Sequence, residues 1–164
     1  ILDLISSEEK TLLNEKSLHL GWSVVDPKTV EKYIASLNEM GVDKITFIYS
    51  DYSQKNFKVN IEKLEKILIN SSCQCGRSNI IKLDVCKNIE TFIKENPDTY
   101  FLDFSNVSIN EKCDEIKTLV IGCEGGFSAK EREKFNKENI VGFNSSLILR
   151  SETAIISAGS KILL

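Results

Sequence analysis

Two short stretches, residues 121–128 and 148–154, carry the residue types that could do chemistry. The first reads I-G-C-E-G-G-F-S, and its glycines let the backbone approach a ligand closely and adopt positive φ without a Cβ clash. Ser128 stands three residues before Glu131, which is the spacing of a capping box, so a helix should start there with open N–H groups. The second reads I-L-R-S-E-T-A and brings an arginine, a hydroxyl and a carboxylate together.

Each stretch follows a run that is typical of a buried strand. The apolar run 118–121 precedes the first stretch and the run 140–143 precedes the second, while Ser151 could cap a final helix that ends at Leu164. A strand, a glycine loop and a helix start in succession indicate a ligand loop at the carboxyl edge of a parallel sheet. Either loop alone also fits an ordinary strand-to-helix turn, and the pair is the more specific signal.

The other elements predict an α/β domain. We expect further strands at 18–25, 45–49, 79–83 and 99–104, and helices that begin at Asp26 with Pro27, at Asn60 and over 88–96. Residues 105–117 read as a polar connection. Strands that alternate with helices favour a mostly parallel sheet with helices on both faces.

Composition limits the possible classes of protein. A chain of 164 residues fits one domain, and no apolar run approaches the ~20 residues that cross a membrane. Lys+Arg 21 against Asp+Glu 24 gives a net charge of −3, whereas a chain that binds RNA unaided usually carries a basic surplus. The 5 cysteines lack zinc-type spacing and the sole histidine, His19, is far from them, so we expect no metal and reduced thiols in a cytoplasmic protein. His19 has no partner at a catalytic spacing and is expected to be structural.

The paired loops resemble the cofactor loops of the knotted SPOUT methyltransferases. They are most similar to the family that methylates N3 of a uridine in small-subunit ribosomal RNA, whose motifs read roughly IGPEGGFS…E and LGxRILRTETA. Residues 74–77 (Q-C-G-R) are similar to that family's EQxxR segment, and residues 102–105 stand where a third cofactor loop follows a strand. Cys123 replaces the family's proline, Ser151 replaces its threonine, and residues 144–147 lack its arginine.

This resemblance implies a fold, a cofactor and partners. The fold would be a trefoil-knotted SPOUT domain over residues 18–164, with residues 1–17 a remnant of, or a linker from, an absent N-terminal RNA-binding barrel. The cofactor would be S-adenosyl-L-methionine. The partners would be 16S rRNA or the small ribosomal subunit and a second copy of the chain in a homodimer.

The resemblance also implies the roles of individual residues. Glu124 or Glu152 could accept the N3 proton, and Arg77 or Arg150 could stabilise the resulting anion. The same matching assigns cofactor contacts to Leu102, Phe104, Ser105, Gly122, Cys123, Glu124, Gly125, Gly126, Ile148, Leu149, Arg150, Ser151 and Thr153.

Other functions remain open at this point. A dinucleotide oxidoreductase would need GxGxxG and a P-loop enzyme would need Gly-Lys-Ser/Thr after the glycines, and both signatures are absent. A different SPOUT RNA methyltransferase, such as one acting on a ribose 2′-hydroxyl, fits the same loops. So does a non-catalytic domain that binds S-adenosylmethionine or RNA and dimerises.

Overall fold

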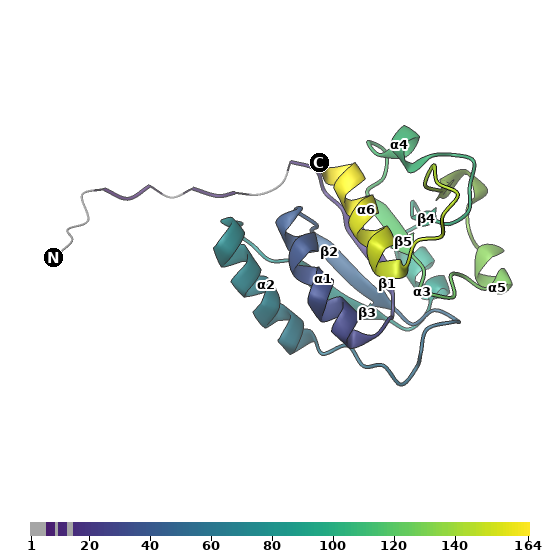
Figure 1. Ribbon diagram of the computed structural model, residues 1–164, viewed down its shortest axis with the longest axis horizontal. Helices are drawn as coiled ribbons and strands as arrows, with labels where there is room; N and C mark the ends of the chain where they lie inside the picture. Colours follow the sequence, from purple (N-terminus) through teal and green to yellow (C-terminus); the bar gives the residue numbers. More distant parts are fainter. Residues whose placement is uncertain (1–5, 9, 13–14) are drawn as a thin grey trace.

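The computed structural model describes residues 6–8, 10–12 and 15–164, and these form one parallel sheet flanked by helices (Figure 1). The 6-stranded sheet has the order β3-β2-β1-β5-β4-β6, and every neighbouring pair is parallel. The strands are β1 (His19–Ser23), β2 (Lys44–Ile48), β3 (Lys82–Cys86), β4 (Tyr100–Leu102), β5 (Thr118–Ile121) and β6 (Ile140–Val141). The α-helices are α1 (Pro27–Glu39), α2 (Ile61–Cys75), α3 (Ile89–Glu95), α4 (Ile109–Lys112), α5 (Ala129–Arg132) and α6 (Ser151–Leu163).

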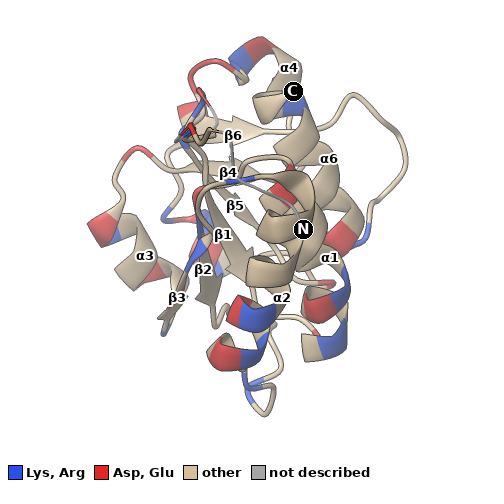
Figure 2. Ribbon diagram, turned by 90° about the vertical axis from the view of Figure 1, so that its left-hand side faces the viewer, with Lys and Arg blue, Asp and Glu red and all other residues tan. Residues whose placement is uncertain are grey.

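The helices lie on both faces of the sheet, as the sequence predicted. α1, α2 and α6 pack side by side on one face, and α3 lies on the other (Figure 2). The strand β5 shows how the two faces are filled, because Leu119 and Ile121 join the larger hydrophobic cluster while Val120 joins the smaller one around Phe92 and Phe101. The expected α/β class with a parallel sheet is therefore confirmed, and the knot stays a prediction.

Local capping signals placed most helix starts correctly. Asp26 accepts from the Lys28 backbone N–H at the start of α1, and Asn60 accepts from Lys63 N–H at the start of α2. The capping box of Ser128 and Glu131 is present, although α5 extends for only 4 residues. Residues 105–117 also contain α4, a turn of helix with a capping box of its own.

Two of the sequence predictions about elements were wrong. The strand expected at 79–83 runs instead over Lys82–Cys86, because Asn79 and Ile81 serve a buried polar network around Asn38. Ser151 does not cap α6, since Arg150 occupies the capping position without a side-chain bond. The proposed linker at residues 1–17 lies partly outside the described residues. Among the described residues, no helix is long and apolar enough to cross a membrane.

His19 is a structural residue of the sheet, as expected. Its Nε2 lies 2.8 Å from the Thr46 hydroxyl, and its ring packs against Phe92 with centroids 5.3 Å apart. Burial, reinforced by the charge of Lys44, lowers the pKa of His19 from 6.5 to about 4. The folded protein therefore holds this imidazole neutral over most of the mildly acidic range.

This pKa predicts a component of acid sensitivity. The unfolded chain binds the proton first, so the free energy of unfolding should fall as the pH drops from 6.5 to about 4. His19→Gln keeps a partner for Thr46 and removes the titration. Urea unfolding of both proteins across this range should give a steeper pH dependence for the wild type, and parallel curves would contradict the assignment.

Candidate active site

A cavity of about 660 Å³ opens at the carboxyl edge of the sheet. Its walls come from the segments that follow β4, β5 and β6, with lining residues within 102–106, 121–127 and 142–149. The size lies within the range of about 300–1,000 Å³ that is usual for small-molecule sites. The two stretches singled out from the sequence therefore meet at one cavity, together with the third loop after β4.

The glycine loop after β5 is a tight turn. The Gly126 N–H donates to the Cys123 carbonyl over 2.9 Å, and Gly126 has φ 67°, a conformation that favours glycine. A Cβ on Gly122 would lie only 3.0 Å from the Gly126 Cα. The loop thus presents bare backbone to the cavity because its glycines allow it to fold back on itself.

Ser151 joins the two loops through buried hydrogen bonds of its side chain. Its Oγ donates to the Gly122 carbonyl over 2.6 Å and accepts from the Trp22 indole N–H over 2.9 Å. All of these polar groups are buried, and Ser151 itself is only 4% exposed. The serine expected to cap α6 therefore holds the glycine loop against β1 and the start of α6.

A residue that the sequence analysis missed, Gly142, closes the opposite wall. A Cβ there would lie 2.9 Å from the Ser105 carbonyl oxygen and 3.1 Å from that of Asp103. Ser105 in turn donates its hydroxyl to the Ile140 carbonyl over 2.9 Å. The close approach of these two segments requires glycine, and a glycine directly after a predicted strand was the available signal.

An ion pair that sequence reasoning also missed spans the cavity wall. Arg132 Nε lies 2.6 Å from one Asp103 carboxylate oxygen and its NH2 group 3.1 Å from the other. Hydrogen bonding to Asp103 raises the pKa of Arg132 above its usual value. This paired geometry fixes the loop after β4 to α5 and leaves both side chains on the lining of the cavity.

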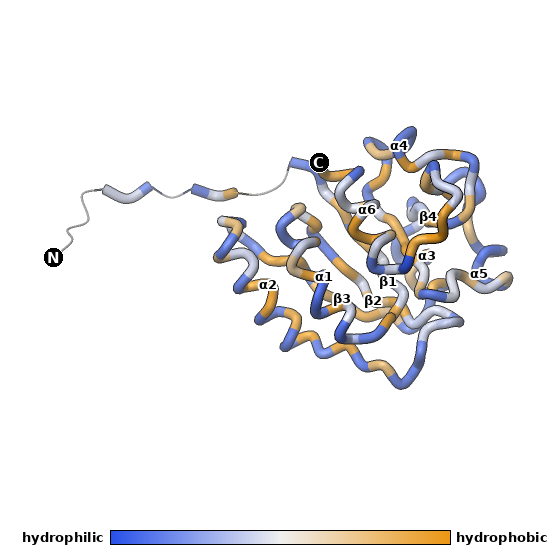
Figure 3. Tube along the Cα trace, viewed as in Figure 1, coloured by the Kyte–Doolittle hydropathy of each residue, from blue (hydrophilic) through white to orange (hydrophobic). Residues whose placement is uncertain are grey.

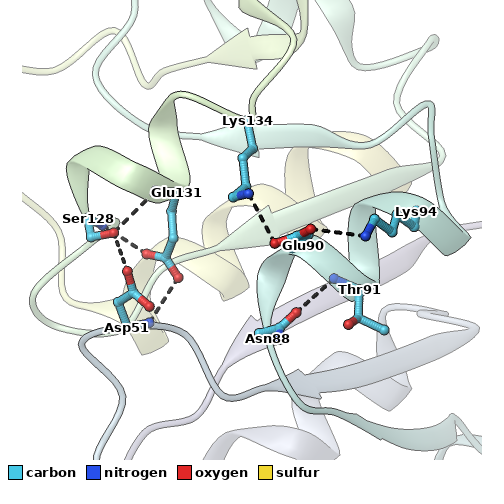
Figure 4. A network of polar contacts seen from close by, with 8 residues as sticks. All are labelled: Asp51, Asn88, Glu90, Thr91, Lys94, Ser128, Glu131 and Lys134. Carbon is cyan, nitrogen blue, oxygen red and sulfur yellow. Dashed lines mark hydrogen bonds and ion pairs between the residues drawn. The ribbon is translucent and has the colours of Figure 1, made fainter.

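A buried carboxylate anchors the start of α5, as Figure 4 shows. Glu131 is 6% exposed, and its oxygens accept the Ser128 N–H over 2.8 Å and the Asp51 N–H over 2.9 Å. The Ser128 hydroxyl donates to the Asp51 carboxylate over 2.5 Å. The capping box therefore also fastens the segment that follows β2 to the glycine loop.

A second, exposed cluster lies beside this anchor in Figure 4. Glu90 pairs with Lys94 and with Lys134, each over 3.0 Å. These hydrogen bonds, that of Lys94 first, lower the pKa of Glu90 to about 2. Lys94 on α3 and Lys134 after α5 are therefore both engaged in ion pairs at the surface.

Most of the predicted cofactor residues line the cavity. Those that do so are Leu102, Phe104, Ser105, Gly122, Cys123, Glu124, Gly125, Gly126, Ile148, Leu149 and Ser151. Arg150, Glu152 and Thr153 stand at the beginning of α6 outside the lining, with Arg150 and Thr153 exposed and Glu152 half-buried.

Arg77 lies away from the others. It follows the carboxyl end of α2, at the amino edge of the sheet, and donates to the Asn38 carbonyl over 2.8 Å and to the Asn79 side chain over 2.5 Å. Burial lowers the pKa of Arg77 from its usual value, and nearby Asp43 opposes that change. Its hydrogen bonds hold the end of α1 to the segment after α2, and Arg77 does not line the cavity.

The outer rim of the cavity is strongly apolar. Phe104 is 78% exposed, Leu147 76% and Ile148 81%, although all three line the cavity. The tube of Figure 3 shows a hydrophobic stretch in the segment that leads into α6. Among the described residues, no group of three or more His, Cys, Asp or Glu side chains could hold a metal ion.

Comparison with known proteins gives one consistent result. A family model described as an RNA methyltransferase domain matches residues 13–163. The chain is 37% identical over 163 residues to the ribosomal RNA small subunit methyltransferase E of Helicobacter pylori, covering 98% of this chain and 72% of that protein. The protein of the same name from Aquifex aeolicus is 31% identical over 165 residues, covering 93% and 71%.

Solved structures agree on the fold. A methyltransferase from Legionella pneumophila in complex with S-adenosylmethionine superposes with a TM-score of 0.73 at 25% identity, covering 93% of this chain and 67% of that one. The ribosomal RNA small subunit methyltransferase E from Neisseria gonorrhoeae, bound to S-adenosylmethionine, gives 0.78 at 17% identity, covering 91% and 66%.

The buried bridge of Ser151 yields a prediction for stability. Ser151→Ala leaves the Trp22 indole N–H and the Gly122 carbonyl without this partner, which should lower the free energy of unfolding by about 1–3 kcal/mol. Ser151→Thr retains the hydroxyl and should lose much less. Urea unfolding measures both, and in a cycle with Trp22→Phe the two losses should not add. Additive losses would show that the hydrogen bond between Trp22 and Ser151 contributes nothing.

Proposed function

The chain belongs to the RNA methyltransferase family, and from this membership we propose that it transfers the methyl group of S-adenosylmethionine to N3 of a uridine in 16S rRNA. The observation that supports this most directly is the glycine loop at the cavity, in a chain whose family match covers residues 13–163. We further propose that it acts in the cytoplasm, on the small ribosomal subunit or its rRNA.

The cavity fits such a cofactor in its size and in the chemistry of its walls. Gly125 and Gly126 present bare backbone on the lining, which suits polar contacts, and Leu149 and Leu102 supply apolar walls for a flat ring. Bound S-adenosylmethionine supplies an electrophilic methyl group on a sulfonium. The protein therefore has to bind and orient the cofactor and the substrate, and to exclude competing reactions. Cys123 stands where the family has a proline. It is 6% exposed and packs into the core, so we assign no chemical role to its thiol.

The residues around the mouth are suited to the substrate side of the reaction. Uracil N3 must lose its proton to become nucleophilic, and Glu124, an exposed carboxylate on the cavity lining, is our first candidate to accept it. Glu152 in the first turn of α6 is the second candidate. Arg150 is exposed directly before α6 and carries the charge to stabilise the imide anion, whereas Arg77 is occupied elsewhere.

The position of N3 also constrains the RNA. N3 lies on the Watson–Crick edge of uracil, so a paired uridine cannot present it to the enzyme. The target must therefore be unpaired and turned out of its stack when it enters the cavity. A ribose 2′-hydroxyl would not require this, and mapping the methyl group separates the two activities.

We also propose that two copies of the chain assemble. Phe104, Leu147 and Ile148 form an exposed apolar rim. Single exposed apolar residues are common on protein surfaces, whereas a group of them indicates an interaction site. A second copy would cover it, and would bring exposed residues such as Arg150 next to a neighbouring site. An isologous interface of this kind would complete each cavity with residues from the partner.

The first test of the function is cofactor binding. Calorimetry should detect binding of S-adenosylmethionine by the wild type, and Gly126→Ala should weaken it by about tenfold or more because the turn must change. Gly76→Ala is the matched control, since Gly76 has φ 78° and Gly126 φ 67°, and Gly76 caps α2 away from the cavity. Absence of heat with millimolar ligand would refute the proposal.

The second part of the same test locates the methyl group. Mass spectrometry of 16S rRNA from cells that lack the protein should show one uridine without its N3 methyl group. The purified chain, given S-adenosylmethionine and small subunits from those cells, should restore it. Methylation of a ribose, or of another base, would keep the family and overturn the proposed specificity.

The homodimer gives a separate prediction. Light scattering at tens of micromolar should show a dimer, and Ile148→Asp should shift it toward monomer because a charge would be buried in the interface. Ile69→Asp is the control, since Ile69 is a 51% exposed apolar residue on α2. A monomeric wild type, or equal effects of both variants, would argue against an interface at the rim.

A further inference from the structure

The segment between β2 and α2, residues 49–60, stands beside the cavity and has no part in the cofactor loops. We refer to it as the β2–α2 loop. It leaves β2 at the same carboxyl edge of the sheet at which the cavity opens. Three of its side chains are exposed and suited to nucleic acid, namely Tyr52, Lys55 and Lys58. Tyr52 is 56% exposed although it is a large aromatic residue.

Internal bonds hold this loop in one shape. The Ser50 and Ser53 hydroxyl groups lie 2.9 Å apart, and the Tyr49 hydroxyl donates to the Phe57 carbonyl over 2.8 Å. The Asp51 N–H donates to the buried Glu131 carboxylate, as described above. Phe57 and Val59 pack against the core. The exposed side chains therefore project from a fixed frame and lose little backbone entropy on binding.

Tyr52 lies directly against the glycine loop. A Cβ built on Gly125 would be 3.1 Å from the Tyr52 Cβ and 3.2 Å from its ring carbon Cδ2. The open side of Gly125 thus accommodates this tyrosine. The ring therefore lies against Gly125, which is part of the cavity lining, and Tyr52 is still 56% exposed.

The two lysines of the loop are free to bind anions. None of the ion pairs formed within the described residues includes Lys55 or Lys58. The only acidic residue of the loop, Asp51, accepts the Ser128 hydroxyl and belongs to the anchor of α5. In a chain of net charge −3 the loop is therefore a locally positive stretch next to an exposed aromatic ring.

We propose that the β2–α2 loop is the entry platform for single-stranded RNA. Tyr52 stacks on a base next to the target nucleotide, and Lys55 and Lys58 bind the phosphates on that side. Aromatic stacking together with cations along the backbone is the usual way in which proteins hold unpaired RNA. The identity of the target rests on the proposed function, whereas the binding of RNA by this loop does not.

The lysines are tested by the salt dependence of RNA binding. Fluorescence anisotropy of a labelled oligouridine with the full chain gives the slope of log affinity against log salt. Lys55→Gln with Lys58→Gln should reduce that slope by about 1.4, because each lost contact to a single strand removes about 0.7. Lys82→Gln with Lys117→Gln removes the same charge from exposed, unpaired lysines at the opposite edge of the sheet and should change it far less.

Tyr52 is tested by a matched pair of substitutions. Tyr52→Leu should weaken oligouridine binding by about 5- to 100-fold, because stacking on one base is lost, while Tyr52→Phe should stay near the wild type. Calorimetry with S-adenosylmethionine accompanies both, so that a disturbed glycine loop is recognised by lost cofactor affinity. Unchanged cofactor affinity with weakened RNA binding is the result that supports stacking.

The outcomes separate this inference from the function. If the two lysine pairs have equal effects, if Tyr52→Leu binds RNA like the wild type, or if the wild type binds no RNA even at low salt, the entry platform is refuted. If methylation is found at another base but the loop variants weaken RNA binding as described, the specificity fails and the platform stands.

Discussion

The site depends on one buried hydroxyl that joins three distant parts of the chain. Ser151 receives the indole N–H of Trp22 from β1 and donates to the carbonyl of Gly122 after β5. Because all of these polar groups are buried, each would be costly without its partner. The bridge therefore fixes where α6 begins relative to the glycine loop. The apolar rim residues that precede α6 are held at the cavity for the same reason.

Around this bridge the walls of the cavity are rigid, whereas its mouth carries exposed side chains. The walls of the cavity are set by backbone contacts that permit no side chain, at Gly122 and at Gly142. The ion pair of Asp103 and Arg132 and the buried carboxylate of Glu131 fasten the neighbouring segments. The mouth, in contrast, carries exposed groups with few internal bonds. In the proposed function, S-adenosylmethionine would be bound by this preformed frame, and RNA would meet side chains that remain free to adapt.

The sequence predicted those features whose causes are local. The caps at Asp26 and Asn60 and the box of Ser128 and Glu131 act within a few residues, and all were placed correctly. Ser151 was assigned to a cap because a serine before a helical pattern normally serves there. Its actual partners lie 129 and 29 residues away, and no local pattern contains them.

The same limit explains the remaining omissions. Asp103 and Arg132 pair across 29 residues, and Glu131 reaches Asp51 across 80. The start of β3 was misplaced because Asn79 and Ile81 are engaged by a buried network that reaches α1. The two loops were paired from their residues, and their assignment to S-adenosylmethionine came from their resemblance to a family. Residues at the beginning of α6 were assigned to the cavity by that matching, yet Arg150, Glu152 and Thr153 lie outside the cavity lining.

Net charge alone does not show where the unpaired cations of this chain stand. The balance of −3 counts every lysine equally, although Lys94 and Lys134 share Glu90, and Lys63 pairs with Glu31 over 2.6 Å. Cations that already have a carboxylate partner gain less from a phosphate, because the first pair must be broken. What matters for RNA is the position of the unpaired cations, since exposed charges are screened beyond about 10 Å. Two of them, Lys55 and Lys58, stand on the loop that begins at the edge of the cavity, and there an acidic protein is locally basic.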